Sequence, residues 1–130
     1  MSKVKHTDVR RKIVVVDDDV LIRETVRLAL DHAGYYVIAV GEAERALSVV
    51  RAEKPDLIIM DLYMPGFDGR ELIRSIKSDP EIARTPVILF SGSDEAIDVV
   101  SGLQSGAIEY LGKPIDGEIL LSKIRHILKV

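Results

Sequence analysis

The chain of 130 residues contains no cysteine, and this absence removes several classes of protein. Disulfide bonds, zinc sites built from thiolates and cysteine nucleophiles are all excluded. A chain without cysteine also fits a reducing compartment. An export signal is missing too, because the basic start is followed by an apolar run of only four residues, 13–16.

Long hydrophobic runs are absent as well. No stretch of the sequence approaches the roughly 20 apolar residues that a membrane-spanning helix needs. We therefore expect a cytoplasmic protein that makes no membrane contact.

The sequence also lacks an excess of positive charge. Eighteen Lys and Arg against 21 Asp and Glu leave a net charge of −3, which predicts no general affinity for nucleic acid. Residues 1–12 carry a charge of +4, so the body of the chain is acidic. We expect residues 1–11 to form a flexible basic leader, a basic contact for a partner being the less favoured interpretation. Residues 12–130 are long enough for one domain with one core.

Short runs rich in Val and Ile alternate with segments of helical periodicity. The runs do not alternate polar with apolar residues, which is typical of strands buried on both faces of a parallel sheet. They cover residues 13–16, 36–40, 57–60, 87–90 and, more weakly, 109–111. Apolar stripes after each run predict five helices. The stripe of the fourth helix consists of Ala96, Val100, Leu103 and Ala107.

Alternating strands and helices predict an α/β domain, in which a parallel sheet has helices on both faces. The strand order could be the flavodoxin-like order 2-1-3-4-5 or that of half a Rossmann fold. Five βα units in a chain this short favour the flavodoxin-like (βα)5 order. In such a sheet the carboxyl ends of all strands meet at one edge, where ligands bind.

Polar side chains stand at the ends of the predicted strands. They are, in chain order, Asp17, Asp18, Asp19, Asp61, Ser91 and Lys113. In the order 2-1-3-4-5 the first and third strands are neighbours, so Asp17 and Asp18 should lie beside Asp61. Asp19 could instead cap the first helix, and Ser91 could be a turn residue. Asp61 would be costly in a buried strand without a partner, which favours a functional role.

A crowded group of carboxylates predicts a bound cation. Like charges raise one another's pKa and destabilise a fold unless a positive charge compensates them. Carboxylate oxygens without His or Cys favour Mg²⁺, which also binds phosphate oxygens, and Mn²⁺ could take the same place. Lys113 adds a second positive charge and Ser91 a hydroxyl donor. Together these groups fit a site for a phosphoryl group.

Four segments of the chain resemble the receiver domain of two-component response regulators, in particular its stand-alone, CheY-like members. They are IVVVDDD at 13–19, PDLIIMDLYMPGFDG at 55–69, PVILFSG at 86–92 and YLGKP at 110–114. In this order and spacing they extend the resemblance over residues 12–130. The resemblance implies the same flavodoxin-like fold that the periodicity predicts.

The resemblance implies a phosphoacceptor and a set of metal ligands. Asp61 matches the phosphoacceptor. The metal ligands would be the side chains of Asp17, Asp18 and Asp61 and the backbone carbonyl of Tyr63. Tyr63 also stands where the family modulates the lifetime of the phosphorylated state. A bulky side chain there leads to the hypothesis that water reaches the phosphoryl group slowly.

The resemblance also implies a switch. Ser91 matches the switch hydroxyl, although the family more often has threonine there, and Lys113 matches the lysine that binds the phosphoryl group. Tyr110 matches the aromatic residue that changes rotamer on activation. The Lys113–Pro114 peptide bond would be cis, which is uncommon in general.

The implied function is that of a phosphoacceptor in a phosphorelay. A sensor histidine kinase or a histidine phosphotransfer protein would donate the phosphoryl group to Asp61 with Mg²⁺, changing the face formed by the fourth helix, fifth strand and fifth helix. The downstream target would be another protein. The chain would not be an enzyme in the usual sense, because it catalyses only its own phosphorylation and slow dephosphorylation.

Two other functions compete with this interpretation. A Mg²⁺-dependent phosphohydrolase of the haloacid dehalogenase kind also phosphorylates an aspartate, but it needs a second Asp at position 63, where Tyr stands. A phosphorylation-silent interaction module would not need Asp61 and Lys113. No DNA-binding segment follows Val130, so we expect a stand-alone regulator, the alternative being a receiver excised from a longer protein.

Overall fold

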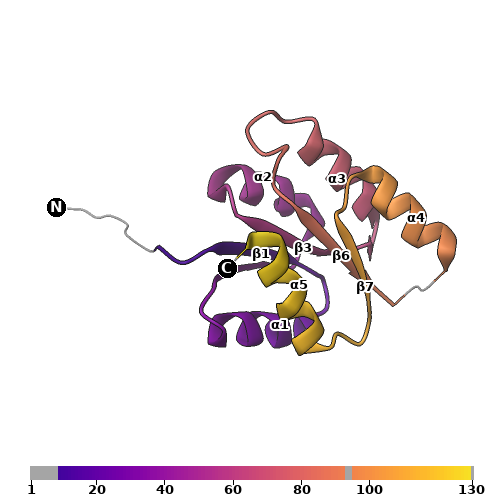
Figure 1. The fold of residues 1–130 in the computed structure, drawn as a ribbon. Helices are drawn as coiled ribbons and strands as arrows, with labels where there is room; N and C mark the ends of the chain where they lie inside the picture. Colours follow the sequence, from indigo (N-terminus) through magenta and orange to yellow (C-terminus); the bar gives the residue numbers. More distant parts are fainter. Residues whose placement is uncertain (1–8, 93–94, 130) are drawn as a thin grey trace.

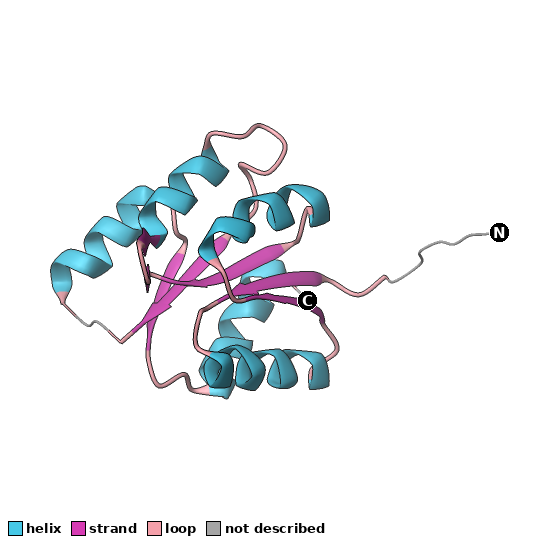
Figure 2. Ribbon diagram, turned by 180° about the vertical axis from the view of Figure 1, so that it is seen from behind, coloured by secondary structure: helices cyan, strands magenta, loops and turns pink. Residues whose placement is uncertain are grey.

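Five parallel strands form a sheet in the order β2-β1-β3-β6-β7 (Figures 1 and 2). The computed structural model describes residues 9–92 and 95–129. The strands are β1 (Lys12–Val16), β2 (Tyr36–Val40), β3 (Leu57–Asp61), β6 (Val87–Ser91) and β7 (Glu109–Gly112). When only the five strands of this sheet are counted along the chain, their order is 2-1-3-4-5. The predicted flavodoxin-like fold is therefore confirmed.

Helices cover both faces of the sheet. They are α1 (Val20–His32), α2 (Ala43–Glu53), α3 (Gly69–Lys77), α4 (Ala96–Ser105) and α5 (Gly117–Leu128). Helices α1 and α5 pack on one face and α2 and α3 on the other, while α4 lies beside α3 and β7 (Figure 1). Within the described residues no helix is both long and apolar enough to cross a bilayer.

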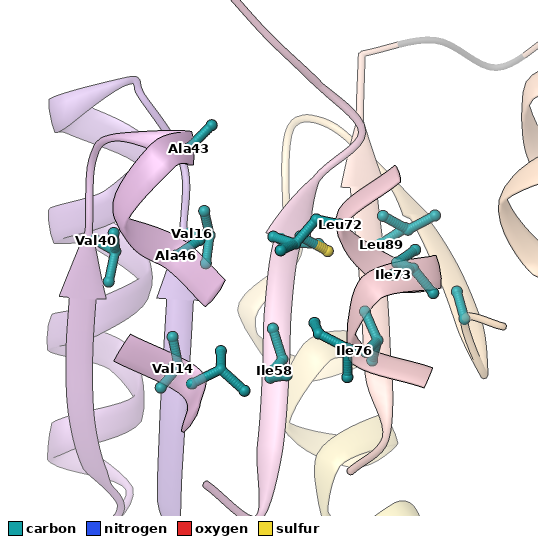
Figure 3. Close-up of a cluster of buried hydrophobic side chains, with 14 of the residues drawn as sticks. Val14, Val16, Val40, Ala43, Ala46, Ile58, Leu72, Ile73, Ile76 and Leu89 are labelled. Carbon is teal, nitrogen blue, oxygen red and sulfur yellow. The ribbon is translucent and has the colours of Figure 1, made fainter. Parts of the chain in front are cut away.

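Each central strand is buried on both faces, which explains the uninterrupted apolar runs. Successive side chains point to opposite faces of a sheet, so each strand supplies two cores. Figure 3 shows the core under α2 and α3, where Val14, Ile58 and Leu89 meet Leu72 and Ile76. The second core packs β1, β3 and β6 against α1 and α5. Burying one such side chain stabilises the fold by about 1.5–3 kcal/mol.

Aspartates cap three of the helices. The Asp19 carboxylate accepts hydrogen bonds from the backbone N–H groups of Leu21 and Ile22, at 2.9 and 3.3 Å. Asp68 caps α3 and Asp116 caps α5 in the same way. A side-chain acceptor satisfies N–H groups that have no partner in the first turn of a helix. Of the roles considered for Asp19, the structure shows helix capping.

A short hairpin follows β3 and was not predicted. It pairs β4 (Tyr63–Met64) antiparallel with β5 (Phe67–Asp68). Gly66 in its turn has a φ of +70°, a conformation that favours glycine. Strands of two residues are too short to produce a periodic pattern in the sequence.

The predicted core face of α4 is wrong. Val100 and Leu103 are 50% and 41% exposed, and Ala96 is exposed as well, whereas the buried residues of the helix are Asp98 and Gly102. The reason is a close approach of the helix backbone. A Cβ atom on Gly102 would lie 2.6 Å from Leu89 Cδ1, so the helix faces the sheet with its smallest residue. Ala107, beyond the helix, is buried as predicted.

Most of the predicted leader, residues 1–8, lies outside the described residues. Val9 is 94% exposed. Arg10 lies 3.7 Å from the Asp31 carboxylate, and its guanidinium carbon is 5.5 Å from the centroid of the Tyr36 ring. From residue 9 onward, the first regular element is β1, which begins at Lys12.

Candidate functional site

The carboxyl edge of the sheet gathers the polar residues expected there. Asp61 and Ser91 are the last residues of β3 and β6. Asp17 follows β1 directly, and its backbone N–H donates to the Val40 carbonyl at 3.1 Å. Lys113 follows β7, and its N–H donates to the Ser91 carbonyl at 2.9 Å. Backbone hydrogen bonds between neighbouring strands therefore hold these four side chains at one edge.

Three carboxylates form the centre of the site. One oxygen from each of Asp17, Asp18 and Asp61 lies within 4.8 Å of the others. Asp17 is fully buried, Asp61 is 7% exposed, and Asp18 is exposed to solvent. The Oδ1 atom of Asp17 accepts the backbone N–H of Asp19 at 2.9 Å, which orients the buried carboxylate.

Lys113 is the cation at this centre. Its Nζ atom lies 3.0 Å from Oδ2 of both Asp17 and Asp61 and 5.1 Å from the centroid of the Phe90 ring. Burial disfavours the charged ammonium, but the two carboxylates outweigh burial and raise the pKa of Lys113. Burial raises the pKa of Asp61, although Lys113 opposes that shift. One ammonium thus contacts two buried carboxylates.

The donor atoms of the site fit a hard divalent cation. Asp17 Oδ2 is buried, and within the described residues its polar contact is the Lys113 ammonium, 3.0 Å away. Three carboxylates against one ammonium leave an excess of negative charge. Oxygen ligands in this number suit Mg²⁺, which completes its coordination with water or phosphate. The carbonyl of Tyr63 as a further ligand stays a prediction.

The backbone of Tyr63 contacts the site, whereas its side chain forms hydrogen bonds outside the site. The backbone N–H donates to Asp61 Oδ1 at 3.3 Å. The phenol donates to Asp98 on α4 at 2.7 Å and accepts a hydrogen bond from Arg70 at 3.0 Å. The hydrogen bond to Asp98 raises the pKa of Tyr63. The side chain is thus bonded to α3 and α4.

Ser91 and Tyr110, the predicted switch residues, are in contact. Ser91 is 4% exposed, and Tyr110 is half-buried on the neighbouring strand. Burial raises the pKa of the Tyr110 phenol, and a side-chain hydrogen bond with Ser91 opposes that shift. A Cβ atom on Gly102 would lie 3.6 Å from the Tyr110 ring, so the ring is also close to α4. A change of rotamer on activation stays a prediction.

Arg23 and Gly41 support the site and were missed from the sequence. Arg23 Nη1 donates to the backbone carbonyl of Asp17 at 2.8 Å. The guanidinium lies against Gly41, where a Cβ atom would be 2.5 Å from Nη1. Arg23 therefore fixes the peptide group between Asp17 and Asp18. A glycine directly after the second predicted strand was the one available signal.

A groove adjoins the site on the side of α1. Its volume is about 490 Å³. The Lys113–Pro114 peptide bond, which is cis, forms part of its wall. Its lining is mostly apolar and comprises Leu21, Ile22, Thr25, Val26, Lys113, Pro114 and Ile115.

Comparison with known proteins identifies the family. The family model of the response regulator receiver domain matches residues 13–125. The transcriptional regulatory protein CseB of Streptomyces coelicolor is 39% identical over 117 residues, which are 90% of this chain and 49% of that protein. The DNA-binding response regulator MtrA of Mycobacterium tuberculosis is 33% identical over 120 residues, 92% of this chain and 51% of that protein. The chain spans about half the length of these curated relatives.

Solved structures agree with the sequence relatives. The chemotaxis protein CheY4 of Vibrio cholerae has a TM-score of 0.86 at 28% identity, covering 92% of this chain and 99% of that one. The BeF3-activated receiver domain of RstA from Klebsiella pneumoniae has a TM-score of 0.85 at 29% identity, covering 92% and 100%. The chain therefore belongs to the response regulator receiver domain family of two-component systems.

Proposed function

We propose that Asp61 accepts a phosphoryl group from a phosphohistidine on a sensor histidine kinase or a histidine phosphotransfer protein. The observation that carries this proposal is the position of Lys113, whose ammonium is 3.0 Å from Asp61 Oδ2. A lysine that contacts a buried carboxylate is in place to neutralise charge on a phosphoryl group attached to that carboxylate. The bond formed joins an Asp61 oxygen to phosphorus, and the bond broken joins phosphorus to the donor's imidazole nitrogen.

The cluster of Asp17, Asp18 and Asp61 is the proposed Mg²⁺ site. When bound, Mg²⁺ supplies positive charge that neutralises the phosphoryl oxygens. Lys113 would hold one phosphoryl oxygen, and the Ser91 hydroxyl would donate to another. Phosphoryl transfer depends mainly on alignment and charge stabilisation, so these side chains are sufficient without a general acid or base.

The proposed output is a change in the face formed by α4, β7 and α5. Ser91 would move toward the phosphoryl group, and the Tyr110 ring would enter the space that it leaves. The contact between these two residues and the closeness of Tyr110 to Gly102 support this route to α4. Such a change is a shift between two packings of one fold.

The apolar groove beside Lys113 is the proposed contact for the phosphohistidine donor. It opens next to the acceptor site and is lined by Leu21 and Ile22 of α1. Leu21 is 76% exposed, and its neighbour Val20 is 61% exposed. An exposed apolar surface beside a site for a macromolecular donor favours a protein partner.

The phosphohydrolase alternative is less well supported. That chemistry needs a carboxylic acid two residues after Asp61, and the phenol of Tyr63 is instead bonded to Asp98. Tyr63 therefore does not supply the carboxylic acid that this chemistry uses as its general acid. We therefore propose a receiver that is modified, with no substrate beyond the phosphodonor.

The proposed function is tested by incubating the protein with acetyl phosphate and Mg²⁺ and measuring the intact mass. We expect one phosphate adduct, which is absent from Asp61→Asn and from a sample treated with a chelator. Asp19→Asn is the matched control, because Asp19 caps α1 and should leave the adduct intact. An adduct on Asp61→Asn, or none on the natural sequence, would refute the proposal.

A further inference from the structure

The attachment of α4 to the rest of the molecule is unusually polar. The helix buries Asp98 and Gly102, while Ile97, Val100 and Leu103 are 73%, 50% and 41% exposed. A helix that buries so little apolar surface has a weak hydrophobic hold on its position. The position of α4 therefore depends largely on specific polar contacts.

Arg70 and Asp98 form the centre of those contacts. Arg70 Nη1 donates to Ser101 Oγ at 2.6 Å and lies 3.6 Å from Asp98 Oδ1. The same guanidinium pairs with Asp68, the N-cap of α3, at 2.6 Å. Asp98 is 8% exposed, and an acidic side chain that is so buried needs partners. The start of α3 is thus joined to α4 by one charge-assisted hydrogen bond, to Ser101, and one ion pair, to Asp98.

Tyr63 connects this cluster to the phosphoacceptor. Its phenol donates to Asp98 at 2.7 Å, its ring centroid is 5.4 Å from the Arg70 guanidinium carbon, and its backbone N–H donates to Asp61 Oδ1 at 3.3 Å. A single residue therefore contacts the carboxylate of Asp61 at one end and α4 at the other.

We propose that Tyr63, Arg70 and Asp98 form a latch that holds α4 in its resting position and is released by phosphorylation of Asp61. This inference rests on the proposed function, since it requires a reaction at Asp61. It adds a second route to α4, through Tyr63, beside the route through Ser91 and Tyr110.

The latch depends on the two contacts that the Asp61 carboxylate makes, one with the Tyr63 N–H and one with Lys113. In the resting state one carboxylate oxygen accepts the Tyr63 N–H and the other contacts Lys113. A phosphoryl group on either oxygen changes the charge that faces the Tyr63 backbone. A shift of the Tyr63 backbone moves the ring as well. The phenol then no longer has the distance and angle that its hydrogen bond to Asp98 requires. By linkage, a partner that draws α4 away would also stabilise the modified state.

The test is amide hydrogen exchange in residues 96–105, with and without acetyl phosphate and Mg²⁺. In the natural sequence we expect phosphorylation to speed exchange in α4 by about fivefold or more, the lower range of allosteric coupling. Tyr63→Phe and Asp98→Asn should exchange faster than the natural sequence before phosphorylation and respond less to it, because only the route through Ser91 and Tyr110 remains in these variants. Tyr63→Phe retains the backbone and ring of an exposed residue, so the fold is maintained.

Arg74→Met provides the matched control. Arg74 Nη1 donates to Ser105 Oγ at 3.2 Å, so this variant also removes a contact between α3 and α4, but at the end away from Tyr63. It should retain the full response. The latch is overturned if Tyr63→Phe and Asp98→Asn respond like Arg74→Met, or if α4 of the natural sequence does not respond. Intact mass of the same samples reports phosphorylation itself, so a failure at Asp61 is distinguished from a failure of the latch.

Discussion

Lys113 and Asp61 are joined by a contact of 3.0 Å between the ammonium nitrogen and Oδ2, and the same ammonium lies equally close to Asp17. Within the described residues, one ammonium contacts two buried carboxylates, so its charge balances only part of theirs. The remaining negative charge destabilises the resting fold, since like charges at this spacing repel one another in a poorly hydrated site. A divalent cation or a replacement of one carboxylate relieves this repulsion.

Asp61→Asn is expected to stabilise the protein at neutral pH. Because the folded-state pKa of Asp61 is raised above 3.8, its stability contribution is complete below that pH and is lost as pH rises through the folded value. The variant should gain about 0.5–2 kcal/mol in the free energy of unfolding at pH 7, the range common for stabilising substitutions. The gain should shrink as pH falls toward 3.8. Urea unfolding followed by circular dichroism across this range measures it.

Asp18→Asn is the control for that experiment. Asp18 belongs to the same cluster but is exposed, so water screens its charge and the gain should be smaller. Equal stability of Asp61→Asn and the natural sequence at pH 7 would contradict the expected repulsion.

Gly41→Ala is expected to weaken Mg²⁺ binding. The added Cβ would lie 2.5 Å from Arg23 Nη1, so the guanidinium must leave the Asp17 carbonyl that it now holds. Losses of about tenfold in affinity are common when a partner of a metal ligand is removed. Calorimetric titration with Mg²⁺ measures the change.

Arg23→Met separates this effect from other causes. In that background no guanidinium remains to be displaced, so adding Gly41→Ala should change the affinity no further. A second loss of affinity in the double variant would show that the two residues act independently. Arg23→Met also removes a positive charge near the cation, so its own loss should be smaller than that of Gly41→Ala.

Ser91→Ala is expected to slow phosphorylation about tenfold or more without changing Mg²⁺ affinity, because the proposed role of the hydroxyl is to donate to the phosphoryl group and Ser91 is not one of the proposed metal ligands. A time course of intact mass with acetyl phosphate gives the rate. Ser91→Thr retains the hydroxyl and should restore most of the rate. If Ser91→Ala reacts as fast as the natural sequence, the hydroxyl has no part in the transfer.

Gly69→Ala is expected to destabilise the fold. A Cβ atom there would lie 2.7 Å from the Asp61 carbonyl oxygen and 2.9 Å from that of Leu62, and backbone cannot move aside as a side chain can. Overpacking of this kind costs about 1–3 kcal/mol. Gly117→Ala is a close control, since Gly117 also begins a helix after an aspartate N-cap but has open space around it. Thermal unfolding should show a lower Tm for Gly69→Ala alone.

The sequence was sufficient to predict the sheet and most of the site. Strands buried on both faces leave uninterrupted apolar runs, and parallel strands bring residues such as Asp17 and Asp61 to one edge whatever the loops contain. The orientation of α4 was not predictable in this way. Its apolar stripe indicates a core face, but the close approach of Gly102 to Leu89 turns that stripe outward.

Local residue patterns by themselves determined the alternation of strands and helices and the polar residues at the strand ends, while the number of βα units in a chain of this length favoured the strand order. Tertiary structure alone decided that Arg23 holds the Asp17 carbonyl and that Tyr63 reaches Asp98. The physical reason is the separation along the sequence of the residues that interact. Periodicity and capping depend on neighbours a few positions apart, whereas the hydrogen bond between Tyr63 of β4 and Asp98 of α4 joins residues 35 positions apart and exists only where the fold packs these two elements together.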